Sequence, residues 1–318
     1  EAGGIEVADY TTASGSRAFA VGNDNSASGS SSTAMGRGTI ASGNDSTAIG
    51  ANTEASGNNS TAMGENTEAS GQGSVAMGQN TTASGTASTA MGYETDASGI
   101  TSTAMGLDTE ASGYGSTAMG YDTEASGYAS TAMGRGTTAS GLYSTAMGYG
   151  TTASGDFSTS IGVVTKASDR SSLVIGEYNL TGSTVTSSAD QFSLDNTAFV
   201  IGNGTANDAR SDAFKVMFNG DATLAGNLSI NSDARLKANI VSLGSTLSKL
   251  LQIDGKSYTM KKDESEKQKI GLLAQDIEKV FPELVSESHG VKSVNYQGLV
   301  PVLILSLIHI SEPTRPDE

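Results

Sequence analysis

The chain has 318 residues, and its 34 Asp and Glu outnumber its 18 Lys and Arg to give a formal net charge of −16. This balance excludes a nucleic-acid-binding protein, which needs a basic face. The chain has no cysteine and two histidines, which excludes disulfides, thiol chemistry and a multi-histidine metal site, so we expect no metal and no cofactor.

A fourteen-residue unit repeats from about Thr12 to Gly176. Each unit carries two glycines seven residues apart, one closing an Ala-Ser-Gly triplet and the other usually closing Ala-Met-Gly. A fixed period of this size is typical of a solenoid, in which each repeat is buried by its neighbours. The four or five residues between glycines are too few for a helix, so the pattern predicts very short strands joined by glycine turns.

Each unit places two apolar residues side by side, an alanine followed usually by methionine or isoleucine. Neighbouring strand residues point to opposite faces, so the pattern predicts two buried faces on one thin coil. We expect the alanines to fill the coil and the second row to contact another chain, because a two-strand coil hardly stands alone in water. This second row, called the Met row below, comprises Val21, Met35, Ile49, Met63, Met77, Met91, Met105, Met119, Met133, Met147, Ile161 and Ile175.

Aromatic residues occupy variable turn positions of the repeat. They fit either a receptor-binding stripe or scattered surface aromatics, and the second interpretation is favoured on sequence alone. If there is a stripe, Tyr93, Tyr114 and Tyr128 are where its contacts should be sought. The full set is Tyr93, Tyr114, Tyr121, Tyr128, Tyr143 and Tyr149.

Carboxylates recur just before Ala-Ser-Gly, at Glu54, Glu68, Asp96, Glu110 and Glu124. Up to residue 180 there are 17 acidic and 5 basic residues, so most of the negative charge lies in the repeat. Such a ladder either binds cations or forms a solvated face that keeps a fibre soluble and blocks edge association. We favour the solvated face.

After Gly176 the period breaks, and residues 177–231 are expected to form a β-rich neck. Asp212–Leu224 alternates with period two around Asn219-Gly220. An Asn-Gly pair between alternating strands is a strong hairpin signal.

The repeat resembles the head of trimeric autotransporter adhesins, the YadA-like family, with methionine where isoleucine is usual. This resemblance implies a mainly β fold over residues 1–176, a left-handed parallel β-roll of fourteen-residue repeats. It also implies a homotrimer with the coils packed around a three-fold axis, which agrees with the two-face argument.

Four further blocks resemble the intramolecular chaperone domain of endosialidase-type tail fibres, the peptidase S74 family. The blocks are SDARLKANI at 232–240, GLLAQDIE at 271–278, FPELV at 281–285 and VNYQGL at 294–299. The resemblance implies a small α+β domain over 232–304, truncated here, that helps a trimeric fibre assemble and then cuts itself off between Asn231 and Ser232. It assigns Ser232 and Lys237 as a Ser–Lys dyad, with Asp233 in support.

The same residues have a second interpretation. Apolar residues at helical spacing predict a helix over about 233–252, and Ser232 is then a normal helix N-cap. As a nucleophile, Ser232 needs a neutral amine to take its proton. Desolvation or nearby positive charge favours the neutral form of a lysine, and burial in a trimer interface would supply desolvation. With the four blocks considered, the dyad is favoured, and both roles can hold together.

Shorter elements are expected along the rest of this domain. Strands are predicted at 252–260, 270–274 and 291–296, and a short helix at 275–280 ends before Pro282. The segment 261–269 reads as a charged turn. A last helix is predicted to begin near Gln297.

The two ends of the chain carry their own expectations. Glu1 is not a start methionine and no signal peptide follows it, so the chain is expected to begin inside a longer protein. Residues 305–318 resemble translated sequencing-adapter read-through, so natural sequence is expected to stop near Ile304. The longest apolar run, 299–310, is too short to span a bilayer, so no membrane insertion is expected.

These observations predict a fragment of a homotrimeric fibrous protein that attaches to a host-surface glycan or protein. It would sit in a virion tail fibre or on a cell surface, and catalysis would be single-turnover autoproteolysis with no external substrate. Two alternatives remain open: a bacterial cell-surface trimeric adhesin, and a structural fibre spacer without cleavage.

Overall fold

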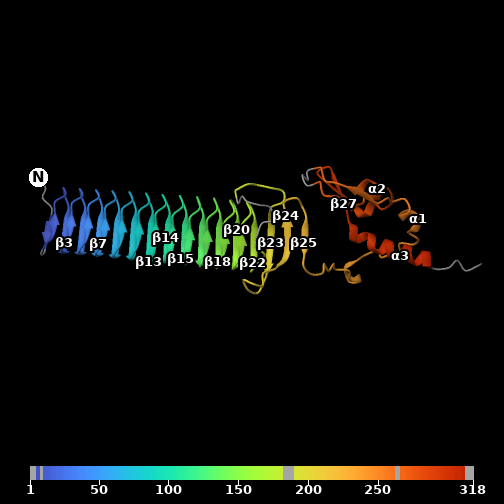
Figure 1. Ribbon diagram of the computed structural model, residues 1–318, viewed down its shortest axis with the longest axis horizontal. Coiled ribbons are helices and arrows are strands. Elements are labelled where there is room, and N and C mark those ends of the chain that lie inside the picture. The colour runs from blue at the N-terminus through green and yellow to red at the C-terminus, as the bar shows by residue number, and fades with distance from the viewer. Residues whose placement is uncertain (1–4, 8–9, 182–189, 262–265, 312–318) are drawn as a thin grey trace, which may run out of the picture. The chain divides into compact units, whose positions relative to one another are not determined.

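The computed structural model describes residues 5–7, 10–181, 190–261 and 266–311. The chain forms two compact units, Glu1–Leu228 and Ser229–Glu318. The first is a long stack of short strands, and the second combines short helices with two-stranded sheets (Figure 1). The division into roll, neck and chaperone at residues 176 and 231 stays a prediction.

The first unit is a solenoid in which each coil contributes one long and one short strand. The long strands are β3 (Phe19–Asn23), β5 (Thr33–Arg37), β7 (Thr47–Ala51), β9 (Thr61–Glu65), β11 (Val75–Gln79), β13 (Thr89–Ala97), β14 (Thr103–Ala111), β15 (Thr117–Ala125), β16 (Thr131–Arg135), β18 (Thr145–Tyr149), β20 (Thr159–Val163) and β22 (Leu173–Glu177). The short ones are β2 (Thr12–Ala13), β4 (Ser26–Ala27), β6 (Ile40–Ala41), β8 (Glu54–Ala55), β10 (Glu68–Ala69), β12 (Thr82–Ala83), β17 (Thr138–Ala139), β19 (Thr152–Ala153) and β21 (Lys166–Ala167). Strand β1 (Ile5–Val7) precedes them, and in β13, β14 and β15 one strand runs through both positions.

The strands of the roll pair in parallel with their counterparts one unit further on, as far as the pairs β19–β21 and β20–β22. Ala104 lies opposite Ala118, and Gly106 lies opposite Gly120, each fourteen residues along the chain. The hydrogen bonds between strands therefore run along the roll, from one coil to the next. The predicted fold class, a mainly β solenoid of fourteen-residue repeats, is confirmed.

Glycine at the Ala-Ser-Gly corner is required by close contact between coils. A Cβ added to Gly99 would lie 2.0 Å from the carbonyl oxygen of Gly113 in the next coil. At the other corner Gly106 has a φ of 135°, in a region that side chains rarely adopt. Glycine is therefore required for different reasons at the two corners. At the Ala-Ser-Gly corner the reason is packing, and at the other corner it is backbone conformation together with packing.

The interior of the roll is narrow and is filled by small side chains. The alanines of both strands are fully buried from Ala20 to Ala153, which confirms the alanine interior predicted from the repeat. Rows of Ser and Thr, such as Ser116 and Thr123, are buried beside them. Among the described residues, seventeen of these buried hydroxyls have no hydrogen-bond partner. Where serine replaces alanine, Ser160 Oγ lies 2.8 Å from Thr165 Oγ1.

The regular stack ends in an antiparallel meander. Strand β23 (Thr197–Asn203) continues the parallel stack on β22, but Gly202 pairs with Gly176, twenty-six residues earlier. Strands β24 (Asp212–Met217) and β25 (Ala222–Leu224) then follow in antiparallel order. The turn between them contains Gly220, whose N–H donates to the Met217 carbonyl, as the predicted hairpin requires.

The second unit has a small apolar core. Ile277, Phe281 and Val302 are buried, with partly buried side chains such as Leu250 and Val294 packed against them. Its elements are η1 (Ala234–Leu236), α1 (Leu247–Leu250), β26 (Lys256–Tyr258), β27 (Lys269–Gly271), α2 (Ala274–Val280), η2 (Pro282–Leu284), β28 (Val285–Ser288), β29 (Val291–Val294), η3 (Tyr296–Gly298) and α3 (Leu299–Ser311). Part of the predicted charged turn at 261–269 lies outside the described residues. Among the helices that the structure describes, none has the length and apolar character needed to cross a membrane.

The predicted helix over 233–252 is wrong. That segment holds a single 3-10 turn, Ala234–Leu236, and the short helix Leu247–Leu250. Asn239 and Gly244 between them have φ values of 54° and 63°, which a right-handed helix cannot accommodate. The stripe residue Ile240 is 67 % exposed, so no burial of an apolar face offsets these local preferences.

Replacing Gly99 by alanine should destabilise the roll. The new Cβ would have to displace backbone of the next coil, which we expect to cost about 3 kcal/mol or more of unfolding free energy. Gly226→Ala is the matched control, because that glycine has open space around it. Urea unfolding of the two variants measures the difference, and equal stabilities would contradict the packing argument.

Candidate functional site

The predicted dyad residues meet in the second unit. Lys237 donates a hydrogen bond from Nζ to Ser232 Oγ over 2.7 Å, within the reach required between a nucleophile and its base. Both residues are exposed, and Asn231, on the other side of the predicted cleavage point, is exposed as well. The geometry is compatible with the dyad, and its catalytic role stays a prediction.

A single 3-10 turn brings Lys237 back toward Ser232. Asp233 is the N-cap of this turn, and its Oδ1 accepts the Arg235 N–H at 2.9 Å. The Lys237 N–H donates to the Ala234 carbonyl at 3.1 Å and closes the turn. The interpretation of Ser232 as the helix N-cap is therefore wrong, because the neighbouring aspartate holds that position.

The Arg235 side chain also binds the Asp233 carboxylate. Its Nε lies 3.1 Å from both carboxylate oxygens, and its Nη2 lies 2.6 Å from Oδ2. Arg235 lowers the pKa of the Asp233 carboxyl through this contact and its backbone hydrogen bond. The carboxylate in turn raises the pKa of the guanidinium. Sequence reasoning assigned no role to Arg235, although the Asp-x-Arg spacing was visible.

The segment that follows the dyad carries apolar side chains without a cover. Leu236, Ile240 and Val241 are 72 %, 67 % and 82 % exposed. An amine accepts a serine proton only when it is neutral, and a lysine in water keeps its proton at neutral pH. An exposed apolar surface next to the two side chains is a candidate surface for association with another chain.

A buried polar contact ties the first and last helices of this unit together. The Thr246 hydroxyl, at the start of α1, donates to the Val302 carbonyl at 2.9 Å and lies 2.8 Å from Ser306 Oγ. Thr246 and Ser306 are both buried. Ser306 falls within residues 305–318, whose origin as adapter sequence stays a prediction, and residues 312–318 lie outside the described part.

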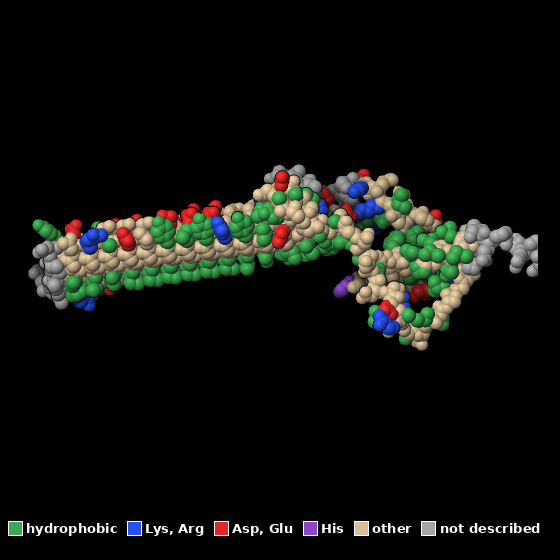
Figure 2. Space-filling model, turned by 90° about the horizontal axis from the view of Figure 1, so that it is seen from below, with side chains coloured by type: hydrophobic (Ala, Val, Ile, Leu, Met, Phe, Trp, Pro, Cys, Tyr) green, Lys and Arg blue, Asp and Glu red, His purple; other side chains and the backbone are tan. Residues whose placement is uncertain are grey.

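The Met row forms an apolar strip along the roll. Its members are half-buried or exposed in every coil, whereas the residue before each, usually alanine, is buried. Figure 2 shows an unbroken band of hydrophobic side chains running along this unit. Among the residues of the roll that the structure describes, no other apolar position that reaches the surface recurs in every unit. A strip of this length on one face is a candidate surface for association with another chain.

The turn aromatics are stacked rather than scattered. Tyr114 and Tyr128 stack with ring centroids 5.0 Å apart, and Tyr143 stacks on Phe157 at 5.1 Å. Arg170 lies over the Phe157 ring at 4.8 Å. Between these two pairs, Tyr128 meets Tyr143 edge to face at 5.4 Å, so the four rings form one continuous row along the roll. This ladder is a surface feature that the sequence pattern did not resolve.

A second row lies on the opposite corner of the coils. Arg135 is placed between Tyr121 and Tyr149, 5.2 Å and 5.7 Å from the two ring centroids. Tyr93, on the same row, is exposed. Its hydroxyl interacts with Glu94, and this contact raises the pKa of the Tyr93 phenol. Both aromatic rows occupy the later coils, since the earlier coils carry polar residues at these positions.

The predicted acid ladder is present in register. Glu54 pairs with Glu68, and Asp96 pairs with Glu110, which pairs with Glu124. Desolvation first, then the charges of Glu110 and Glu68, raise the pKa of the Asp96 carboxyl. No three His, Asp or Glu side chains in the described part of the chain are grouped so as to hold a metal ion.

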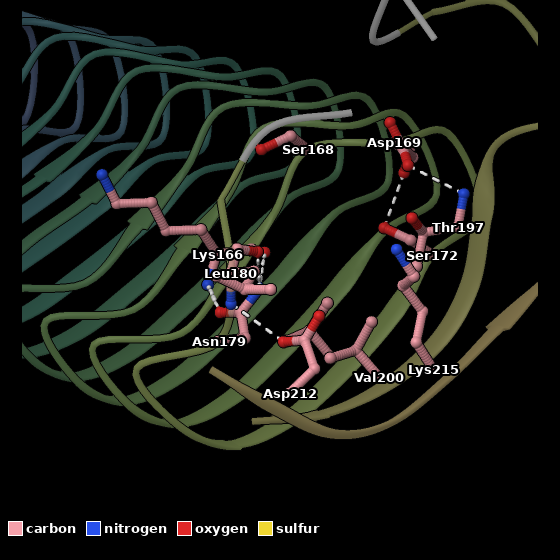
Figure 3. Close-up of a pocket in the computed structure, with 11 residues that line it drawn as sticks. Lys166, Ser168, Asp169, Ser172, Asn179, Leu180, Thr197, Val200, Asp212 and Lys215 are labelled. Carbon is pink, nitrogen blue, oxygen red and sulfur yellow. Dashed lines mark hydrogen bonds between the residues drawn. The ribbon is translucent and has the colours of Figure 1, made fainter. Parts of the chain in front are cut away.

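One small cavity lies where the last coil meets β23 and β24 (Figure 3). Asn179 accepts the Lys166 N–H at 2.8 Å, and nearby the Leu180 N–H donates to Asp212 at 2.8 Å. Burial raises the pKa of the Asp212 carboxyl, against the opposing effects of the Leu180 N–H and Lys215. At about 40 Å³, the cavity has room for a water molecule or two and not for a sugar. These contacts close the open end of the roll.

Comparison with known families matches both units, in chain order. The YadA head domain repeat matches residues 13–39, 41–67, 69–95, 97–123, 125–151, 139–164 and 153–176, which together cover half of the chain. The chaperone of endosialidase matches residues 232–286, a stretch that begins at Ser232 and includes Lys237. No curated protein gives a significant match.

Asp96→Asn should make the roll more stable at neutral pH. The folded-state pKa of Asp96 is raised, so the contribution of this carboxyl group to stability is fully present below the ordinary aspartate pKa and is lost as pH rises through the raised value. The variant has no charge at this position, so its free energy of unfolding should exceed that of the wild type by about 0.2–1 kcal/mol at pH 7. Near pH 3 it should show no gain. Urea unfolding at the two pH values measures it, with Thr82→Asn, at the register partner of Asp96, as a control that removes no charge. A gain of the same size at both pH values would contradict the electrostatic cause.

Proposed function

Because the chain belongs to the family of proteins built from YadA head domain repeats, we propose that it is a homotrimeric fibre that attaches to a host surface. Its chaperone domain would then assist assembly and release itself. The observation that carries the proposal is the order of the two matched regions, a long repeat roll followed by a chaperone of endosialidase.

The Met row supports association of the roll with copies of itself. The interior holds alanine and small hydroxyl side chains, so one coil buries little apolar surface by folding alone. Bringing three Met rows together at a common axis would bury the largest apolar strip of the unit. The row recurs in every coil, so the contact would run the whole length of the roll.

The chaperone domain favours a phage or prophage tail fibre over a bacterial cell-surface adhesin. Autotransporter adhesins are anchored by a C-terminal membrane domain, whereas here the region after the roll matches the chaperone of endosialidase. A structural spacer without cleavage is the remaining candidate. The receptor would be a glycan or a protein, met at the exposed turn positions that carry Tyr93, Tyr114 and Tyr128.

Self-cleavage would follow from the contact between Ser232 and Lys237. Neutral Lys237 takes the Ser232 hydroxyl proton, and Oγ attacks the carbonyl carbon of Asn231. The bond from that carbon to the Ser232 nitrogen breaks, the nitrogen takes the proton from Lys237, and an ester joins Asn231 to Oγ. Water hydrolyses the ester, leaving a carboxylate on Asn231 and a free amine and hydroxyl on Ser232.

Trimer formation would control this reaction. The dyad is exposed in the single chain, and the uncovered apolar residues Leu236, Ile240 and Val241 lie beside it. A second copy packed on this segment would exclude water from the dyad and favour the neutral amine. Cleavage would then wait until assembly is complete.

A charge in the middle of the Met row should dissociate the fibre. Met119→Lys would bury ammonium groups at the proposed axis without partners, which is strongly unfavourable. Light scattering should give three chain masses for the wild type and one for the variant. Leu107→Lys is the matched control, because Leu107 is 41 % exposed at a coil corner. A wild type that scatters as one chain would overturn the trimer.

Wild-type chain should separate into a piece ending at Asn231 and a piece beginning at Ser232. Ser232→Ala removes the nucleophile and Lys237→Ala removes the base, so both should stay whole. Lys237→Arg keeps a charge that cannot be lost and should stay whole as well. Intact mass spectrometry of the wild type and the three variants measures whether each chain is cut. If the wild type remains uncut as a trimer, the spacer alternative stands; if the Ser232 variant still cuts, the assigned nucleophile is wrong.

A further inference from the structure

We propose that Arg235 is a positioning residue of the cleavage site, because its guanidinium keeps the Asp233 carboxylate from pairing with the Lys237 ammonium. The inference rests on the proposed self-cleavage and adds a residue to it. Arg235 would contact neither Asn231 nor Ser232 and would act through its ion pair with Asp233.

Both oxygens of the Asp233 carboxylate accept hydrogen bonds from Arg235. Oδ1 accepts the Arg235 backbone N–H at 2.9 Å and Nε at 3.1 Å. Oδ2 accepts Nε at 3.1 Å and Nη2 at 2.6 Å. A planar guanidinium matches a carboxylate in this forked geometry, and a lysine at the same place would not. The carboxylate is thus engaged on both oxygens.

Asp233 would otherwise compete for the base. It directly follows Ser232, whose Oγ accepts the Lys237 Nζ hydrogen bond at 2.7 Å. Along the chain it is the acidic residue nearest to Lys237. A carboxylate paired with Lys237 would stabilise the protonated amine, and a protonated amine cannot accept the serine proton. Arg235 removes this competitor by pairing with it.

The surroundings leave few other charges to act on the base. In the described residues, the carboxylate and guanidinium nearest to Lys237 in the chain, Asp233 and Arg235, lie on its own turn. The ion pairs of the rest of this unit, such as Lys279 with Asp276 and Lys292 with Glu287, join other elements. No helix or strand described in the unit packs extensively on η1. Asp233 and Arg235 are therefore the charged pair on the turn that carries Lys237.

The test measures the pH dependence of cleavage in the full chain. Arg235→Ala should move the midpoint of the pH–rate profile upward by about 0.2–0.7 unit, because the released Asp233 carboxylate would stabilise the Lys237 ammonium. The cleavage rate at the high-pH plateau should stay unchanged. Arg235→Ala combined with Asp233→Asn should return the midpoint to the wild-type value, since asparagine still caps the turn but carries no charge. Arg235→Lys should give an intermediate shift.

A second readout separates this inference from the cleavage itself. In the Ser232→Ala background nothing can be cut, and NMR titration of selectively labelled lysine follows the Lys237 ammonium directly. Its titration midpoint should rise on Arg235→Ala and return on adding Asp233→Asn. An unchanged midpoint, or a lowered plateau that Asp233→Asn does not restore, would show that Arg235 is only structural. An uncut wild type with the expected titration shifts would overturn the cleavage proposal and leave the positioning role standing.

Discussion

The structure of the roll depends on backbone-to-backbone contact between successive coils at the Ala-Ser-Gly corner. There a single added carbon on Gly99 would come within 2.0 Å of the next carbonyl oxygen, so the coils are as close as two main chains can be. This contact fixes the fourteen-residue period, since any residue inserted or lost at the corner moves a side chain into it. The in-register strands, the narrow interior and the continuous outer rows all follow from that period.

The narrow interior changes what stabilises the fold. Fully buried alanines such as Ala104 contribute little apolar area each, and hydroxyls such as Thr109 Oγ1 are buried with no partner among the described residues. The backbone hydrogen bonds between coils satisfy peptide groups that the narrow roll buries. Larger apolar side chains are therefore displaced to the outside, in the Met row and the aromatic rows. Stability and surface character have a common origin.

Much of the roll could be predicted because its periodicity is a property of the sequence itself. The solenoid, the alanine interior and the hairpin at Asn219-Gly220 follow from spacing and turn chemistry. The prediction of a helix over 233–252 was wrong because its apolar stripe has no surface to pack against. In addition, Asn239 and Gly244 adopt left-handed backbone conformations. The contact of Arg235 with Asp233 was missed because it depends on a single 3-10 turn rather than on spacing along a helix. Stacking of Tyr114 on Tyr128 needed the corner geometry, which composition alone does not supply.

The register of the roll also makes its length adjustable. Since Ala104 and Ala118 occupy equivalent places, removing or duplicating a whole unit joins one coil to another like it and leaves both ends of the stack unchanged. Each unit adds about 4.8 Å, so the twelve long strands span roughly 55 Å along the stack. Nearly identical units invite unequal recombination between copies. Descendants of this chain can therefore differ in reach by whole steps while every interior contact is preserved.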